Sequence, residues 1–193
     1  MADVRITELE ELTSLLADDM FAVAENATTA TKKVSYATIS HRPHAMLSDS
    51  TTQSITNASN AQAITFNTNE VVLDITHSTV TNSDRIYVDK AGVYEIIISA
   101  IGALSGGTNQ KLNMWFAVEG TNVARSNTIV NLGGASEQIV AVAYIYTFTA
   151  GQYFQVMISG SATTVRLLAT GTQVTPTRPA SPSIILTIKR ISK

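Results

Sequence analysis

The stretch that decides the fold is Ile139-Val-Ala-Val-Ala-Tyr-Ile-Tyr-Thr-Phe148, a run rich in β-branched and aromatic side chains. Successive side chains of a β-strand point to opposite faces. One face would carry Ile139, Ala141, Ala143 and Ile145, and the other Val140, Val142, Tyr144, Tyr146 and Phe148. A strand at the surface of a monomeric antiparallel sandwich normally has one polar face. Because both faces are apolar here, the pattern predicts that a partner subunit covers one of them.

Two further stretches repeat this pattern. Val93–Ala100 is apolar on both faces apart from Glu95, and Ile184–Ile188 places apolar residues on one face with Ile185 left on the other. From residue 44 onward the chain consists of short apolar or alternating runs separated by Asn, Ser, Gly and Asp, with no helical pattern. Such spacing predicts an all-β sandwich or barrel. Doubly apolar strands favour an obligate oligomer.

Composition excludes several classes of function. The chain has 193 residues, enough for one domain and a short extension, and 13 basic against 15 acidic residues give a net charge of −2. This balance offers no attraction to nucleic acid. The absence of cysteine excludes disulfides and thiolate chemistry. No apolar run reaches the about eighteen residues of a membrane helix, so no membrane insertion is expected.

The first forty residues differ from the rest. Leu9, Leu12 and Leu16 lie three and four positions apart, and Thr7 with Glu10 forms a capping box, so a helix is predicted from Ile6 to about Asp19. Alternating apolar residues then predict two short strands around a loop. Their apolar positions are Phe21 and Val23, then Val34 and Tyr36. Pro43 marks the boundary, which gives an N-terminal segment over 1–43 and a second domain over 44–193.

The residue patterns of the common catalytic and metal sites are not found. His41, His44 and His77 are the only histidines and lack zinc-site or triad spacing, so no enzyme activity, cofactor or metal is expected. Trp115 alternates with Met114 and Phe116 and must face away from them. It is either a ring exposed for ligand stacking or a packing residue beneath a loop, and packing is the favoured interpretation.

A set of short motifs from residue 53 onward resembles one family. They are Thr65-Phe66, Asp84-Arg-Ile-Tyr-Val88, Ala91-Gly-Val-Tyr94, Asn113-Met-Trp-Phe116, Tyr146-Thr-Phe148 with Ala150-Gly-Gln152, and Pro182-Ser-Ile-Ile-Leu-Thr-Ile188. This order resembles the jelly-roll heads of tumour necrosis factor and of complement component one q, in the version found in bacteriophage virion proteins. Gln152 stands where the family usually has Asp. The resemblance implies a trimeric jelly-roll head.

The N-terminal segment has its own resemblance. Ile6-Thr-Glu-Leu9, Asp19-x-Phe21-x-Val23 and Thr31-Lys-Lys-Val34 resemble the attachment region of phage fibres and decoration proteins. The two resemblances together imply a homotrimeric virion protein: a head-decoration protein, a head fibre or a short tail fibre. Its N-terminus would dock on a capsid or tail protein through residues 1–40. It would be made in the host cytoplasm and face outward on the surface of the virion.

These interpretations define the candidate residues. Ala141, Ala143 and Ile145 on one face, or Tyr144, Tyr146 and Phe148 on the other, are the candidates for the trimer interface, and the sequence does not choose between them. The candidates for the virion anchor are Leu9, Leu12, Leu16, Phe21, Val23, Val34 and Tyr36. The alternative function is recognition of a host glycan or protein through loops such as 105–109 and 131–136.

Overall fold

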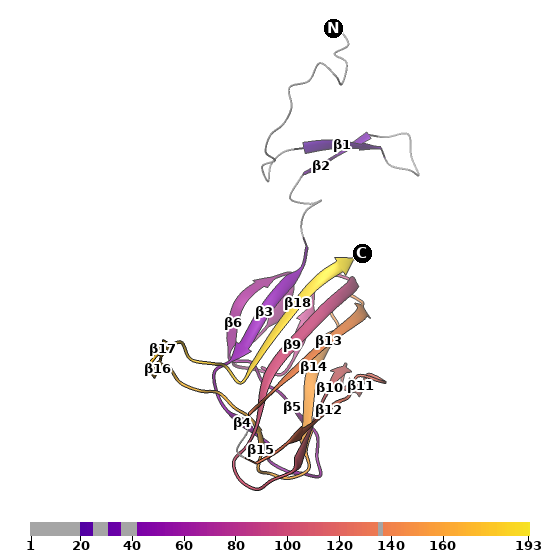
Figure 1. The fold of residues 1–193 in the computed structure, drawn as a ribbon. Helices are drawn as coiled ribbons and strands as arrows, with labels where there is room; N and C mark the ends of the chain where they lie inside the picture. Colours follow the sequence, from indigo (N-terminus) through magenta and orange to yellow (C-terminus); the bar gives the residue numbers. More distant parts are fainter. Residues whose placement is uncertain (1–19, 25–30, 36–41, 135–136) are drawn as a thin grey trace, which may run out of the picture. The chain divides into compact units, whose positions relative to one another are not determined.

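The computed structural model describes residues 20–24, 31–35, 42–134 and 137–193. The chain divides into two compact units, Met1–His41 and Arg42–Lys193 (Figure 1). The division falls two residues before the boundary predicted at Pro43.

The N-terminal unit contains one antiparallel strand pair. β1 (Met20–Ala24) pairs with β2 (Thr31–Ser35), and Phe21 lies opposite Val34 in the register. These strands lie where alternation predicted them. The helix predicted from Ile6 to about Asp19, and Tyr36, lie outside the described residues.

The second unit is a sandwich of two antiparallel sheets. The first, here called the β9 sheet, has the order β4-β15-β9-β18-β3-β6, with β13 also paired to β9. Its strands are β3 (His44–Asp49), β4 (Gln53–Ser54), β6 (Thr68–Leu73), β9 (Gly92–Leu104), β13 (Gln138–Phe148), β15 (Val165–Leu167) and β18 (Ile184–Ser192). Since β13 and β18 pair with the same stretch of β9, they lie on its opposite sides. This places β13 at one edge of the sheet.

The second sheet, here called the β10 sheet, has the order β11-β10-β14-β8-β7, with β12 paired to β10 and β5 to β14. Its strands are β5 (Gln62–Ala63), β7 (Ile75–His77), β8 (Ile86–Val88), β10 (Gln110–Val118), β11 (Thr121–Asn122), β12 (Thr128–Leu132) and β14 (Tyr153–Gly160). A small hairpin of β16 (Gln173–Val174) and β17 (Thr177–Arg178) projects from the sandwich (Figure 1). The predicted all-β sandwich is confirmed. Within the described ranges, no helix could cross a membrane.

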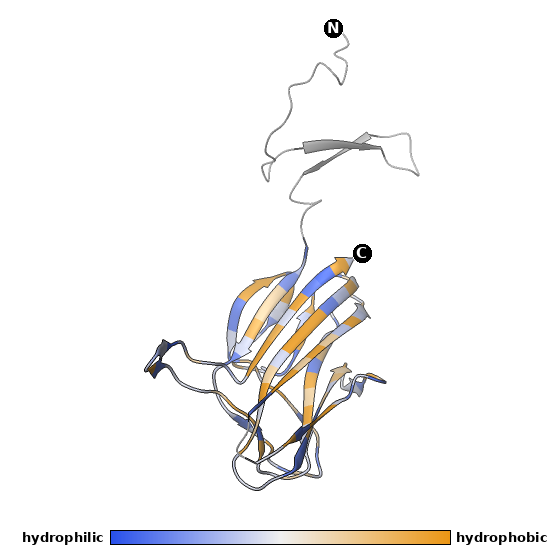
Figure 2. Ribbon diagram, viewed as in Figure 1, coloured by the Kyte–Doolittle hydropathy of each residue, from blue (hydrophilic) through white to orange (hydrophobic). Residues whose placement is uncertain are grey.

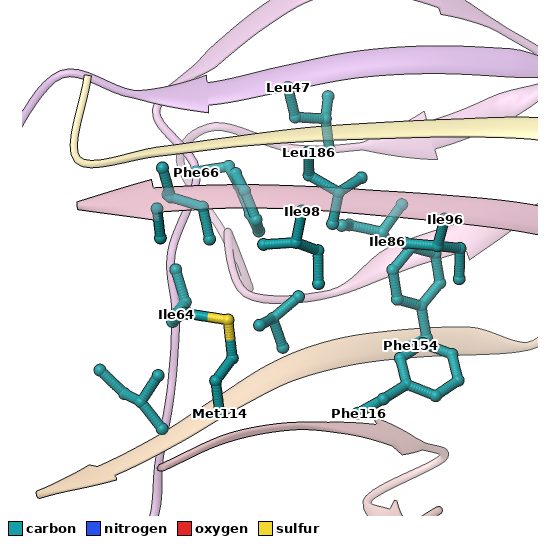
Figure 3. Packing of buried hydrophobic residues seen from close by; sticks show 14 of the residues in the cluster. Leu47, Ile64, Phe66, Ile86, Ile96, Ile98, Met114, Phe116, Phe154 and Leu186 are labelled. Atoms are coloured by element: carbon teal, nitrogen blue, oxygen red, sulfur yellow. The ribbon is translucent and has the colours of Figure 1, made fainter. Parts of the chain in front are cut away.

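The core lies between the two sheets. Side chains of the β9 sheet, such as Ile96 and Ile98, point toward Met114 and Phe116 of the β10 sheet (Figure 3). On β9 the buried residues alternate with partly or fully exposed ones from Gly92 to Ile101, as a pleated strand requires. Hydrophobic residues, coloured orange, recur along the strands of both sheets (Figure 2).

The motifs at residues 92–94 and 146–148 meet in this core. Tyr94 is opposite Tyr146 in the register, and its ring lies edge-on to Phe148 with centroids 5.7 Å apart. Gly92 begins β9 with φ +154°, and a Cβ there would lie 2.5 Å from the backbone oxygen of Ser192. The β9–β18 pairing therefore needs glycine at this position.

The turn after β13 shows the role of the Gln152 side chain. Gln152 accepts a hydrogen bond from the backbone N–H of Thr149, at 2.9 Å, while Gly151 adopts φ +85°. The side-chain oxygen of Gln152 thus stabilises the turn through a hydrogen bond to the backbone of Thr149.

Candidate functional site: an exposed apolar sheet face

The strand quoted at the outset, β13, presents its two apolar faces to different surroundings. Ala141, Ala143 and Ile145 are exposed, and Ile145 retains 68% of its accessible surface. Tyr144 and Tyr146 are half-buried, and Phe148 is 1% exposed. The structure therefore separates the interface candidates into an outward set and an inward set.

The aromatic set is covered by the chain itself. The ring of Tyr144 stacks on Phe116 with centroids 5.5 Å apart and 19° between the planes. Its hydroxyl donates a hydrogen bond to the backbone oxygen of Ser126, at 2.6 Å. Burial raises the pKa of Tyr144, and a hydrogen bond with Thr128 opposes part of that rise. Phe148 packs against Tyr146 at 4.9 Å between centroids. These rings belong to the core, so the outward set is what remains for a partner.

The outward set continues across the β9 sheet. The register places Ala143 opposite Ile97, Ile97 opposite Thr187, Thr187 opposite Met46, and Met46 opposite Val71. Side chains directly opposite one another in antiparallel strands lie on the same face. Five strands thus contribute to one row, and most of its members are apolar.

We call this surface the apolar face and define it as Met46, Val71, Ile97, Ile139, Ala141, Ala143 and Ile145, all exposed. Ile139 retains 75% of its accessible surface and Ile97 44%. A contiguous apolar surface of this kind on a protein commonly marks an interaction site.

The apolar face has a polar border and a hollow. Glu95, which lies opposite Ile145 in the register, forms an ion pair with Lys189, with 2.7 Å between the carboxylate oxygen and the ammonium nitrogen. A hollow of about 630 Å³ opens beside it, with Met46 and Val71 in its wall and Arg42, Lys189 and Arg190 also lining it. The face can therefore accept an apolar surface with a polar edge.

The outer face of the β10 sheet is different in character. A hollow of about 410 Å³ lies there, lined by Asn113, Trp115, Asn122, Val123, Arg125, Asn127 and Ser159. Trp115 is half-buried and faces away from Met114 and Phe116, as alternation predicted. The sequence favoured a packing role for Trp115. The structure shows that the residue is half-buried and also lines the hollow, so packing is only part of its role.

Some of these residues were not identified from the sequence. Met46 and Val71 belong to the apolar face although neither lies in a doubly apolar run. The signal available was the alternation in His44–Asp49, which sets Met46 opposite in direction to Ala45 and Leu47. Asn122, Arg125 and Asn127 come from one segment, residues 122–127, and this segment lies beside Trp115 only because the chain folds back onto β10.

The remaining candidates are in the N-terminal unit. Leu9, Leu12, Leu16 and Tyr36 lie outside the described residues, whereas Phe21, Val23 and Val34 lie in β1 and β2. Among the residues that the structure describes, no three His, Asp or Glu side chains cluster in a way that could hold a metal ion.

Comparison with known proteins identifies the fold. No protein-family model matches the chain, and no curated protein sequence matches it. The crystal structure of murine APRIL at pH 8.0 is similar with a TM-score of 0.52 and 10% identity, covering 78% of this chain and 99% of that one. The crystal structure of murine APRIL at pH 8.5 is similar with a TM-score of 0.50 and 10% identity, again covering 78% of this chain and 99% of that one. The likeness shows that the sandwich is a jelly roll of the tumour necrosis factor type.

Proposed function

We propose that the chain is a non-enzymatic, homotrimeric structural protein of a bacteriophage particle. Its jelly roll forms an outward head, and residues 1–40 dock on a capsid or tail protein. The role is that of a head-decoration protein, a head fibre or a short tail fibre, located on the surface of the virion. No cofactor or metal takes part.

The observation that carries the trimer is the apolar face. Burying an exposed isoleucine or valine side chain is worth about 1.5–3 kcal/mol, and the face presents several. Oligomers close by symmetry, and a three-fold arrangement can place the β13 edge of one subunit against the apolar face of the next. Such packing would also protect an edge strand that otherwise exposes unpaired backbone groups. The tumour necrosis factor type of jelly roll supports this arrangement.

The virion role is supported by the resemblance in the sequence and by the division of the chain into two units at residue 41. A short strand pair such as β1–β2 is marginally stable alone, which suits a segment that becomes ordered on a partner. Many copies on one particle would add avidity to weak contacts of the heads.

A deletion experiment tests the assignment of roles. The full chain should elute as three subunits in size exclusion with light scattering. Deleting residues 1–40 should leave the trimer intact and abolish incorporation into particles. A monomeric full chain would overturn the trimer, and normal incorporation of the deletion variant would assign attachment to the jelly roll.

The β16–β17 hairpin supplies a matched control. Thr170 and Ser181 are joined by two backbone hydrogen bonds of 2.9 and 2.8 Å, so residues 171–180 can be replaced by a Gly-Gly link. This variant loses an exposed segment of the head and keeps the anchor. It should trimerise and be incorporated like the unmodified chain.

A second candidate function is recognition of a host glycan or protein. The observation that favours it is the polar hollow around Trp115 on the β10 sheet. The two candidates are compatible, because the hollow and the apolar face lie on different sheets.

A further inference from the structure

The hollow around Trp115 has the features of a ligand site. Trp115 is the single tryptophan of the chain. Its indole Nε1 donates a hydrogen bond to Oδ1 of Asn122, at 2.7 Å, which fixes the orientation of the ring. Asn122 lies in β11, which pairs with the end of β10 opposite Ala117. A large aromatic surface is therefore held in place by a neighbouring strand before any ligand arrives.

The other lining groups are mainly uncharged and polar. Nδ2 of Asn127 approaches Oδ1 of Asn113 at 3.4 Å, and Ser159 lies opposite Asn113 in the register. Since Asn113 and Asn122 accept these bonds through their carbonyl oxygens, each keeps an amide NH₂ that can donate. Several short donors and acceptors thus surround the ring, as in sites that fix a small polar ligand.

Arg125 supplies the only formal charge in the lining of this hollow. Its backbone has φ +66° and its side chain is exposed. Within the described part of the chain, its guanidinium takes part in no hydrogen bond or ion pair. A guanidinium without a partner beside neutral amides is suited to bind a carboxylate through two parallel hydrogen bonds.

We infer that this hollow binds a sugar residue that carries a carboxylate, such as a sialic or uronic acid. The apolar face of the sugar ring would stack on Trp115, the asparagines and Ser159 would bind its hydroxyls, and Arg125 would bind its carboxylate. A nucleic acid fits less well, because one arginine does not make a phosphate-binding track. This inference develops the second candidate function and does not depend on the trimer.

The single tryptophan makes a direct test possible. The full-length protein is titrated with the methyl glycosides of N-acetylneuraminic acid, glucuronic acid and glucose, and tryptophan emission is recorded. At least one acidic glycoside should give a saturable change, with an affinity at least about tenfold higher than that of methyl glucoside. Arg125→Gln should lower the acidic affinity at least about tenfold and leave the neutral glycoside unchanged.

Two variants serve as controls. Arg178→Gln removes an exposed arginine of β17 that lies outside the hollow and should bind like the unmodified protein. Trp115→Leu, followed by calorimetric titration, should lose binding while its circular dichroism stays that of a β-sandwich. Retained affinity in Trp115→Leu would overturn the stacking role.

The remaining outcomes also decide the inference. Absence of saturable binding by either acidic glycoside overturns it, and so does an equal response to Arg125→Gln and Arg178→Gln. Equal affinity for acidic and neutral glycosides overturns it as well, because the carboxylate would then contribute nothing to binding. Light scattering on the same samples reports the trimer separately, so failure of sugar binding and failure of the proposed assembly are distinguishable.

Discussion

The two sheets of the sandwich have similar inner faces and different outer faces. Inside, Ile96 and Ile98 of β9 meet Met114 and Phe116 of β10, all buried. Outside, the β9 sheet presents the apolar face, whereas the β10 sheet presents Trp115 among asparagines, Ser159 and Arg125. The inner faces form the core between the sheets. The outer faces are available to partners or ligands, and each carries a separate proposal.

The largest effect is expected from placing a charge on the apolar face. Ile97→Glu would bury a carboxylate without a partner in each subunit contact, so we expect loss of the trimer. Ile129→Glu is the matched control, because Ile129 is 58% exposed and lies on β12 at the outer face of the β10 sheet. It should remain trimeric. Light scattering of both full-length variants gives the subunit number.

The same two variants also give the results that would contradict the proposed trimer interface. A trimeric Ile97→Glu would show that the apolar face is exposed in the assembly. A monomeric Ile129→Glu would move the interface to the other sheet and would conflict with the position of the sugar hollow.

A second expected difference separates the inner and outer faces of one strand. Phe116 is 1% exposed and packs against Tyr144, Phe148 and Phe154, whereas Trp115 is its neighbour on the outside. Phe116→Ala should cost about 3–5 kcal/mol of unfolding free energy through lost burial and a cavity. Trp115→Ala should cost less, about 1–2 kcal/mol, from the hydrogen bond to Asn122 and the covered part of the ring.

Denaturant unfolding followed by far-ultraviolet circular dichroism measures both variants. The signal comes from the sheets and does not require the tryptophan. Equal losses for the two variants would mean that Trp115 is a core residue, which would contradict its role in a ligand hollow.

The sequence predicted the fold because alternation is a local property. The run from Ile139 to Phe148 determined the strand and the membership of its two faces. It did not determine which face the chain itself covers, because that depends on β10. Tyr144 and Phe148 are covered by Phe116, a residue distant in sequence.

The apolar face and the hollow around Trp115 were harder to predict, because their residues come together only through the pairing register of different strands. Met46, Val71 and Ile97 come into one row only when β3, β6, β18 and β9 pair in the observed order. Asn113 and Ser159 likewise meet through the pairing of β10 with β14. Alternation predicted that Trp115 lies on the outer face, but it did not predict which side chains surround the ring.

A smaller effect is expected from pH, and it reports the buried tyrosines. Burial raises the pKa of Tyr94 and of Tyr144 above the ordinary value of 10.0. The unfolded chain therefore releases these protons at lower pH than the folded chain. Their contribution to stability is complete below pH 10.0 and is lost as pH rises through the folded pKa.

Unfolding free energy measured from pH 8 to 11 should accordingly fall above about pH 10. Tyr144→Phe should reduce this fall, because it removes one of the two groups. If the Tyr144→Phe profile equals that of the unmodified chain, the buried hydroxyl is not responsible.

The smallest effect concerns the polar border of the apolar face, and it measures how far a partner extends. The side chains of Glu95 and Lys189 are 30% and 55% exposed in the single subunit. An exposed ion pair contributes about 0–1 kcal/mol and weakens with added salt. Glu95→Gln, Lys189→Met and the double variant should therefore give a coupling energy below about 1 kcal/mol that falls at high salt. A salt-independent coupling of several kcal/mol would mean that the partner subunit covers this pair. The interface would then extend from Ile145 along its row to Glu95 and Lys189.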